Sequence, residues 1–285
     1  MIVSSFRLFQ NAEVGGYAIG AFNVYNLEGV MAVLAAAEAE ASPVMLQLHP
    51  SALKFGGRPL IALCLEAAEN SLTQVAVHLD HSNSESEIRL ALDAGMGSIM
   101  ADGSHFAYDQ NVEFTAKMSR LVHMQGLGVE AELGRLTGSE DGISVPDYEA
   151  KLTNPEQAAE FVQETGIDSL AVCIGNVHGH YRSAPVLDFN RLEEVRRRVH
   201  IPLVLHGASG LPDEMIRRAI ELGVRKFNVN TEVRDAYVQS LKQDLAGSQT
   251  PDLISMMTNA VRSMQVVIRA KIRLFGTDQQ NSKLS

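Results

Sequence analysis

The feature that most constrains the fold is a repeated alternation of short apolar runs with amphipathic stretches. Eight runs rich in β-branched residues have the character of buried strands, at residues 18–24, 43–48, 75–80, 98–102, 126–133, 168–174, 201–206 and 225–229. Amphipathic helical stretches lie between them, for example at residues 28–41, 85–94, 156–165, 191–199 and 213–222. Strands separated by helices pair in parallel through crossover connections.

Eight parallel strands are the number that closes a (β/α)8 TIM barrel, which usually takes about 250 residues. We therefore predict that residues 1–285 form a single α/β barrel domain. An open doubly wound sheet is the alternative fold. It would normally have a glycine-rich phosphate-binding turn after its first strand, whereas this chain has Asn23-Val24-Tyr25-Asn26 there.

Two stretches depart from the alternation. Residues 136–152 follow the fifth strand, are rich in Gly, Ser and Asp, and are expected to be irregular. Residues 251–275 form a long apolar-faced pattern that ends at Gly276 and predicts an extra C-terminal helix, a helical extension of about 251–276. Such a helix packs on the barrel or on a second subunit, so we expect a homodimer or a homotetramer.

Charge and hydropathy exclude several classes of partner. The formal net charge of −10 argues against a general nucleic-acid binder, which needs a concentrated basic surface. No apolar run approaches the ~18 residues of a membrane span, and residues 1–10 lack a signal-peptide pattern. We therefore expect a cytoplasmic protein, with Cys64 and Cys173 as buried, unpaired thiols.

Histidines gather where a barrel places its chemistry, at the carboxyl ends of the strands. Six of the nine histidines fall there, at positions 78, 81, 105, 178, 180 and 206. Three of them, His81, His178 and His206, follow three different strands and can approach one point from three sides. Neutral imidazoles that converge in this way are typical zinc ligands, with an open fourth position in catalytic sites.

Two points remain open in this assignment. His180 competes with His178 as the third ligand, and we favour His178. Strict alternation along the third strand also directs His78 and Asp80 to one side and His81 to the other. His81 can be a ligand only if the strand has already ended there.

Several carboxylates lie near the predicted metal. Asp80 is the candidate proton carrier, and the alternative is a carboxylate that only orients an imidazole. Glu130 and Glu132 point to one side of the fifth strand. Either Glu132 or Asp102 could form an alternative or second metal position.

Small, donor-rich turns follow the seventh and eighth strands. They are Gly207-Ala208-Ser209-Gly210 and Asn228-Val229-Asn230-Thr231, and each precedes the start of a helix. Phosphate sites in barrels are frequently built from these two loops and a helix N-terminus. The turns therefore predict a site for a small phosphorylated substrate.

Taken together, these motifs resemble the class II, metal-dependent fructose- and tagatose-bisphosphate aldolases over nearly the whole chain. The residues that carry the resemblance are Ala21-Phe22-Asn23-Val24, His78-Leu79-Asp80-His81, Asp102-Gly103-Ser104-His105-Phe106, Glu130-Ala131-Glu132-Leu133-Gly134-Arg135, Gly175-Asn176-Val177-His178-Gly179, Leu205-His206-Gly207-Ala208-Ser209-Gly210 and Asn228-Val229-Asn230-Thr231-Glu232. The exact residues of these motifs are more similar to those of the tagatose-bisphosphate branch.

The resemblance implies a lyase that reversibly cleaves tagatose-1,6- or fructose-1,6-bisphosphate to dihydroxyacetone phosphate and an aldehyde such as glyceraldehyde 3-phosphate. It implies one catalytic Zn²⁺ per subunit on His81, His178 and His206, and it leaves room for a monovalent cation. Asp80 would be the acid/base. Glu140, in a loop, matches the glutamate that handles the proton on carbon 3.

The same resemblance implies the residues that hold dihydroxyacetone phosphate. They are Gly179, Gly207, Ala208, Ser209, Asn228, Val229, Asn230 and Thr231. A lysine Schiff base, the other chemical solution for aldol cleavage, is disfavoured. Lys226 is the only lysine in an expected strand, and it is not in the sixth, where barrel aldolases usually have theirs.

One departure and two rival interpretations stand beside this reading. His49 occupies a position after the second strand where relatives usually have serine or threonine, so a ketose phosphate of another length or decoration is an alternative substrate. A metal-dependent hydrolase would normally begin with a His-x-His pair on its first strand, which is missing here. A non-catalytic aldolase-like subunit should have lost a metal histidine or Asp80, and both are kept.

Overall fold

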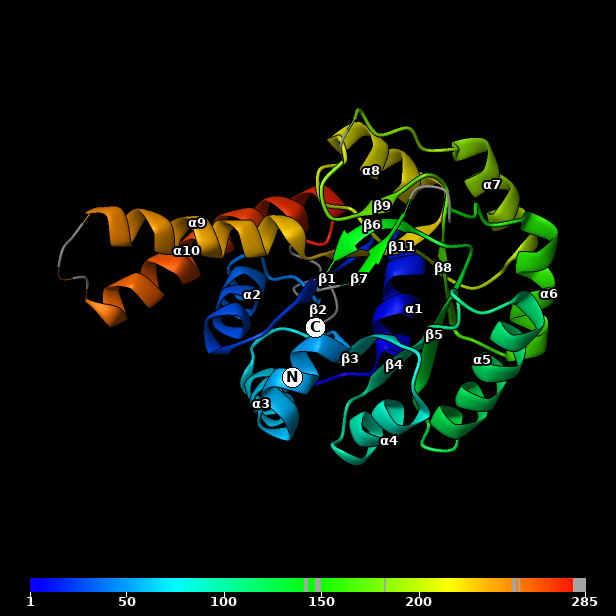
Figure 1. The fold of residues 1–285 in the computed structure, drawn as a ribbon, viewed down its shortest axis with the longest axis horizontal. Coiled ribbons are helices and arrows are strands. Elements are labelled where there is room, and N and C mark those ends of the chain that lie inside the picture. The colour runs from blue at the N-terminus through cyan, green and yellow to red at the C-terminus, as the bar shows by residue number, and fades with distance from the viewer. Residues whose placement is uncertain (141–142, 147–149, 182, 248–249, 251, 279–285) are drawn as a thin grey trace.

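The fold is known from a computed structural model that describes residues 1–140, 143–146, 150–181, 183–247, 250 and 252–278. Eight parallel strands close into a barrel in the order β1, β11, β10, β8, β5, β4, β3, β2 (Figure 1). Their bounds are β1 Ile19–Asn23, β2 Val44–Leu48, β3 Val75–Ser82, β4 Ser98–Ala101, β5 Gly128–Leu133, β8 Ser169–Val172, β10 Leu203–Leu205 and β11 Val224–Val229. The predicted (β/α)8 barrel is confirmed.

Helices connect consecutive strands around the outside of the barrel. They are α2 (Leu27–Ala39), α3 (Pro50–Asn70), α4 (Glu85–Asp93), α5 (Tyr108–His123), α6 (Pro155–Thr165), α7 (Phe189–Arg198) and α8 (Asp213–Glu221). Local sequence sets their ends: the Asn154 side chain accepts a hydrogen bond from the Gln157 N–H at 3.0 Å, and Pro155 begins α6. Gly166 ends the same helix in a left-handed conformation.

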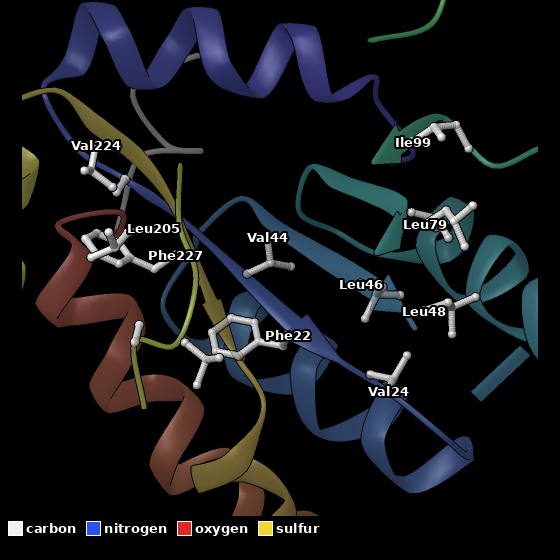
Figure 2. Packing of buried hydrophobic residues seen from close by; sticks show 14 of the residues in the cluster. Phe22, Val24, Val44, Leu46, Leu48, Leu79, Ile99, Leu205, Val224 and Phe227 are labelled. Atoms are coloured by element: carbon white, nitrogen blue, oxygen red, sulfur yellow. The ribbon is translucent and has the colours of Figure 1, made fainter. Parts of the chain in front are cut away.

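Alternate strand residues belong to two separate apolar clusters. One set packs outward against the helices, and Figure 2 shows members of it such as Phe22, Leu46 and Phe227. The other set points into the barrel and includes Ile19, Met45, Ala76, Met100 and Val204. This division follows from the period of two along a strand.

Helix α1 (Ser5–Gly15) closes the amino-terminal end of the barrel. Its Leu8, Phe9 and Ala12 are buried in the same cluster as the first inward-facing residues of the strands. Higher along the strands, the inward positions become polar although they remain buried. They include Asn23, Gln47, His78, Asp80, Glu130, Glu132, Lys226 and Asn228. The barrel interior is therefore apolar below and polar at the carboxyl end.

A small second sheet covers part of that carboxyl end. It pairs β7 (Ile143–Val145), β6 (Thr137–Glu140) and β9 (Val177–His178), and β6 runs antiparallel to β7 and parallel to β9. The expectation of irregular structure over residues 136–152 is wrong for these strands. β9, which pairs with β6, lies far along the chain, so local composition did not indicate it.

The predicted C-terminal helix is confirmed as α10 (Leu253–Phe275), which ends at Gly276 with φ 74°. It pairs with α9 (Thr231–Gly247), and the two helices project from the side of the barrel (Figure 1). The end of α10 packs on the barrel, because Phe275 stacks on Phe227 with ring centroids 4.9 Å apart. Among the described helices, none combines the length and apolar character needed to cross a lipid bilayer.

Candidate metal centre and active site

An irregularity in β3 brings two consecutive residues to the same site. The pairing of β3 with β4 shifts between Leu79 and Ser82, so β3 has one residue more than its partner there. His81 lies at this bulge with φ 46°, an uncommon conformation for a residue other than glycine. The strict alternation that would turn His81 away is thus broken. His81 can therefore face the same site as Asp80.

The structure brings His81, His178 and His206 together from three strands. Their candidate ligand atoms all lie within 4.8 Å of one another. Nε2 of His81 is 2.7 Å from Nδ1 of His206, and the His81 and His178 rings meet edge to face with centroids 5.0 Å apart. His178 lies in this cluster, whereas the exposed ring of His180 lies 3.2 Å from the Asp235 carboxylate.

Carboxylates hold two of these rings from behind. Nδ1 of His81 lies 2.7 Å from Oδ2 of Asp102, and Nε2 of His206 lies 2.9 Å from Oε1 of Glu130. Each contact occupies one ring nitrogen and leaves the other to face the centre of the cluster. Carboxylate–histidine pairs of this kind orient metal-binding imidazoles.

The local electrostatics suit a cation. Burial and the positive charge of His81 lower the pKa of His206 and of His178, so both rings are neutral donors. Burial would also lower the pKa of His81, but Asp80 and Asp102 raise it to about 10. The carboxylates that hold a proton on His81 in the metal-free protein would equally favour a divalent ion in its place.

Asp80 lies directly beside the cluster and does not support a ring. Its Oδ1 is 4.0 Å from Nε2 of His81, while its two oxygens accept hydrogen bonds from Asn23 Nδ2 at 2.9 Å and Asn228 Nδ2 at 3.1 Å. Burial would raise the pKa of Asp80, but the positive charge of His81 holds it well below its ordinary value. A fixed, ionised carboxylate next to the cluster can accept a proton.

A second group of candidate ligands shares one member with the first. His81, Asp102 and Glu132 also have ligand atoms within 4.8 Å of one another. Within the described residues, the buried Oε2 of Glu132 has no hydrogen-bond partner and lies 4.0 Å from Nδ1 of His206. Burial and the nearby Asp102 raise the pKa of Glu132 to about 8. Glu132 thus remains an alternative candidate metal ligand beside the three histidines.

The two predicted anion-binding loops lie at the same end of the barrel. Gly207 has φ 64°, and a side chain there would collide with the Val177 carbonyl. Ser209 Oγ accepts a hydrogen bond from the Glu232 N–H in the first turn of α9 at 3.4 Å, and Thr231 begins that helix. The loop after β10 and the N-terminus of α9 are therefore joined.

The remaining predicted substrate residues surround this junction. Gly179 is buried and has φ 82°, and the Ala208 N–H is 3.4 Å from the Asn228 carbonyl. Asn230 accepts a hydrogen bond from the Tyr25 hydroxyl at 2.8 Å, and Val229 ends β11. Loop donors and a helix N-terminus are suited to an anion such as a phosphate.

A cavity of about 290 Å³ opens beside the histidine cluster. Its lining includes His81 and His178 at one end and His49, His105 and Arg135 around it. His49 caps the N-terminus of α3, and its Nδ1 accepts a hydrogen bond from the Ser51 N–H at 3.2 Å. The unusual residue after β2 therefore faces the space next to the candidate metal centre.

The role expected of Glu140 depends on a side chain outside the described part of the structure. The backbone of Glu140 ends β6, and residues 141–142 of the expected loop are likewise not described.

The other strand-end histidines do not join the cluster. The His105 ring lies tilted against Phe106 with centroids 4.0 Å apart, and His78 lies deeper in the barrel, 2.7 Å from Ser98 Oγ.

Sequence reasoning missed several supporting contacts, including the one made by Asn228, which was predicted only to bind substrate. Asn23 and Asn228 hold Asp80, and Lys226 lies 2.7 Å from Oε2 of Glu130 under the cluster. A signal for them was present: these polar residues alternate along their strands with apolar residues that pack outward, such as Phe22, Phe227 and Val229. A polar residue at such a position must have a buried partner.

The barrel and the histidines that converge at its carboxyl end indicate the class of the protein, and comparison with known sequences agrees. The chain belongs to the family described as fructose-bisphosphate aldolase class-II, whose sequence profile matches residues 3–280. It is therefore a class II aldolase by family and fold, and members of this family are carbon–carbon lyases.

Several solved structures are similar to this chain. The YdjI aldolase from Escherichia coli K12 has 35% sequence identity and a TM-score of 0.89, with 99% of this chain and 100% of that chain covered. A putative fructose-1,6-biphosphate aldolase from Coccidioides immitis has 33% identity and a TM-score of 0.93, with 98% of both chains covered. Fructose-bisphosphate aldolase from Campylobacter jejuni has 22% identity, 98% and 97% coverage and a TM-score of 0.80, a likeness of fold alone.

Proposed function

We propose that this chain is a zinc-dependent aldolase that reversibly cleaves a ketose bisphosphate. The substrates we propose are tagatose-1,6- and fructose-1,6-bisphosphate, and the products are dihydroxyacetone phosphate and glyceraldehyde 3-phosphate. The observation that carries the proposal is the convergence of His81, His178 and His206 beside the ionised Asp80.

The donor set fits a zinc ion. Three imidazole nitrogens within 4.8 Å of one another match the ligands of a catalytic zinc site with an open position. When bound there, a divalent cation would supply stabilisation for the negative charge that carbon–carbon cleavage leaves beside a carbonyl.

The chain's own residues supply the proton transfer and the binding. In cleavage, a carboxylate oxygen of Asp80 accepts the proton of the hydroxyl group that becomes the aldehyde, as the adjacent carbon–carbon bond breaks. In synthesis, Asp80 returns this proton to the same oxygen. Asn23 and Asn228 keep the carboxylate oriented through hydrogen bonds of 2.9 and 3.1 Å.

The phosphate of the dihydroxyacetone phosphate half would bind between the loop after β10 and the first turn of α9. Gly179, Ser209, Asn230 and Thr231 lie around this junction, where backbone N–H groups and the helix dipole favour an anion. The aldehyde half would extend into the cavity lined by His49 and Arg135. The open space and the small turns support a phosphorylated sugar of about this size.

A coupled assay tests the proposal. Purified protein is incubated with tagatose- or fructose-1,6-bisphosphate, and formation of dihydroxyacetone phosphate is followed before chelation, after chelation and after zinc is added back. We expect activity that chelation removes and zinc restores. His206→Ala should lose bound zinc and activity together. Full activity after complete removal of metal would contradict the proposal, and cleavage only of other ketose phosphates would contradict the proposed substrates.

A further inference from the structure

A buried ion pair lies beneath the histidine cluster. Lys226 is fully buried on the inward face of β11, and its Nζ is 2.7 Å from Oε2 of Glu130 on β5. Glu130 is also buried, with 2% of its surface exposed. The attraction between the two opposite charges offsets the cost of burying them, because an isolated charge so deep in a barrel would be strongly destabilising.

The pair is connected to the candidate metal centre through the second carboxylate oxygen. Oε1 of Glu130 lies 2.9 Å from Nε2 of His206, and Nδ1 of the same ring faces His81 at 2.7 Å. Nε2 of His78 approaches Lys226 to 3.5 Å from the other side, and Ser98 Oγ lies 2.7 Å from the remaining nitrogen of that ring. Lys226 is thus held between Glu130 and His78.

We propose that Lys226 is a positioning residue for the metal centre, acting through Glu130 on His206. By pairing with one carboxylate oxygen, Lys226 fixes the direction of the other, which accepts the N–H of His206 Nε2. The His206 ring then has one orientation and one tautomer, with Nδ1 free of a proton and turned towards the cluster. This inference rests on the proposed metal site.

The alternative for Lys226 is a purely structural ion pair that holds β11 to β5. The geometry favours a positioning role because the carboxylate is shared: one oxygen contacts the lysine and the other contacts a ligand ring. Loss of the ammonium would leave Glu130 free to rotate or to take up a proton. In either state it would no longer hold His206 in the same way.

Zinc affinity of the purified, metal-free protein tests the proposal directly. The dissociation constant is measured by competition with a chromophoric chelator for wild type, Lys226→Met, Glu130→Gln and the double variant. Loss of a residue that supports a metal ligand typically lowers affinity about 10–100-fold. We expect a loss of this size for each single variant, and no further loss in the double variant, because both residues act through one ring.

The absorption spectrum of bound Co²⁺ gives a second readout, since it reports the ligand geometry independently of turnover. We expect it to change in Lys226→Met and Glu130→Gln. Arg225→Met is the matched control: Arg225 is the preceding residue of β11, buried, and pairs with Glu13 at 3.4 Å instead of with Glu130. It should lose thermal stability and keep the zinc affinity and the Co²⁺ spectrum of wild type.

Three outcomes would overturn the positioning role while leaving the metal site in place. They are unchanged zinc affinity in Lys226→Met, losses that multiply in the double variant, or an equal loss in Arg225→Met. If Lys226→Met does not fold, Glu130→Gln carries the test, and an unchanged affinity and spectrum there overturn the role. Failure of wild type to bind zinc at all would instead refute the proposed function.

Discussion

At the scale of single residues, Asp80 and His81 divide two tasks between neighbours in the chain. Asp80 is held by two asparagine side chains, whereas His81 is held by Asp102. The sequence alone left open whether Asp80 only orients an imidazole. In the structure Asp102 and Glu130 make those contacts, which leaves the carboxylate of Asp80 available for proton transfer.

Replacement of Asp80 separates these tasks. Asp80→Asn keeps the shape and the size of the side chain, but the amide cannot accept the substrate proton. We expect the variant to bind zinc normally and to lose about 10²–10⁴-fold in the rate of ketose cleavage, the usual contribution of a general acid or base. Exchange of the dihydroxyacetone phosphate proton with solvent, followed by NMR, should be retained in part.

Asp102→Asn is the comparison for this prediction. It removes the carboxylate 2.7 Å from Nδ1 of His81, so its main effect should be weaker zinc binding. If Asp80→Asn loses zinc as Asp102→Asn does, or cleaves substrate at the wild-type rate, the role assigned to Asp80 is wrong.

The position of His81 marks the limit of what could be predicted at this scale. Its residue type and its place near a strand end indicated a ligand, but regular alternation contradicted that assignment. The bulge that resolves the conflict depends on the pairing of β3 with β4, which is a tertiary feature. The same holds for Lys226 and Glu130, whose partnership joins opposite parts of the barrel.

At the scale of elements, the repeat of strands and helices was enough to predict the barrel. Period-two apolar runs define strands wherever one face meets helices and the other meets the interior. Residues 136–152 lacked this signal, because β6 and β7 are short and β6 pairs with β9 from a later part of the chain. Local composition carries no information on such a partner.

The turn after β10 is an element whose geometry depends on one glycine. Gly207 and Gly166 have nearly equal backbone angles, φ 64° and φ 66°, but an added Cβ meets the Val177 carbonyl only at Gly207 and has open space at Gly166. The two glycines thus separate the cost of the left-handed conformation from the cost of a collision.

We expect Gly166→Ala to destabilise the protein by about 1 kcal/mol, the cost of a left-handed alanine. Gly207→Ala should cost more and should also weaken zinc binding, because it moves the residue that follows His206. Urea unfolding of the metal-free variants and zinc competition measure the two effects. Equal stability and equal zinc affinity in both variants would show that the Val177 contact does not constrain the site.

At the scale of the whole molecule, the site concentrates buried charge at one end of the barrel. His81 has a folded-state pKa raised to about 10, and Glu132 has one raised to about 8. Both groups therefore stabilise the metal-free fold while they keep their protons. That stabilisation is present below their unfolded pKa values and is lost as the pH rises through the folded ones.

The stability of the metal-free protein should consequently fall with rising pH, whereas that of the zinc-loaded protein should change less. Between about pH 6.5 and 9, above the unfolded pKa of histidine, the metal-free protein should become less stable. Over the same range zinc binding should strengthen, because it displaces the proton of His81. Thermal unfolding with chelator and with excess zinc measures both curves, and the gap between them should widen with pH. Parallel curves would contradict a proton-competing metal at His81.

The bulge in β3 has a consequence for how such a protein can diversify. Since the proposed proton carrier and a proposed metal ligand are consecutive residues, a single peptide unit sets their separation, and no movement of an outer loop can alter it. The cavity around His49 and Arg135 belongs to other segments of the chain. Changes in that wall alone could thus accommodate sugars of different length, while the relative positions of Asp80 and His81 stay the same.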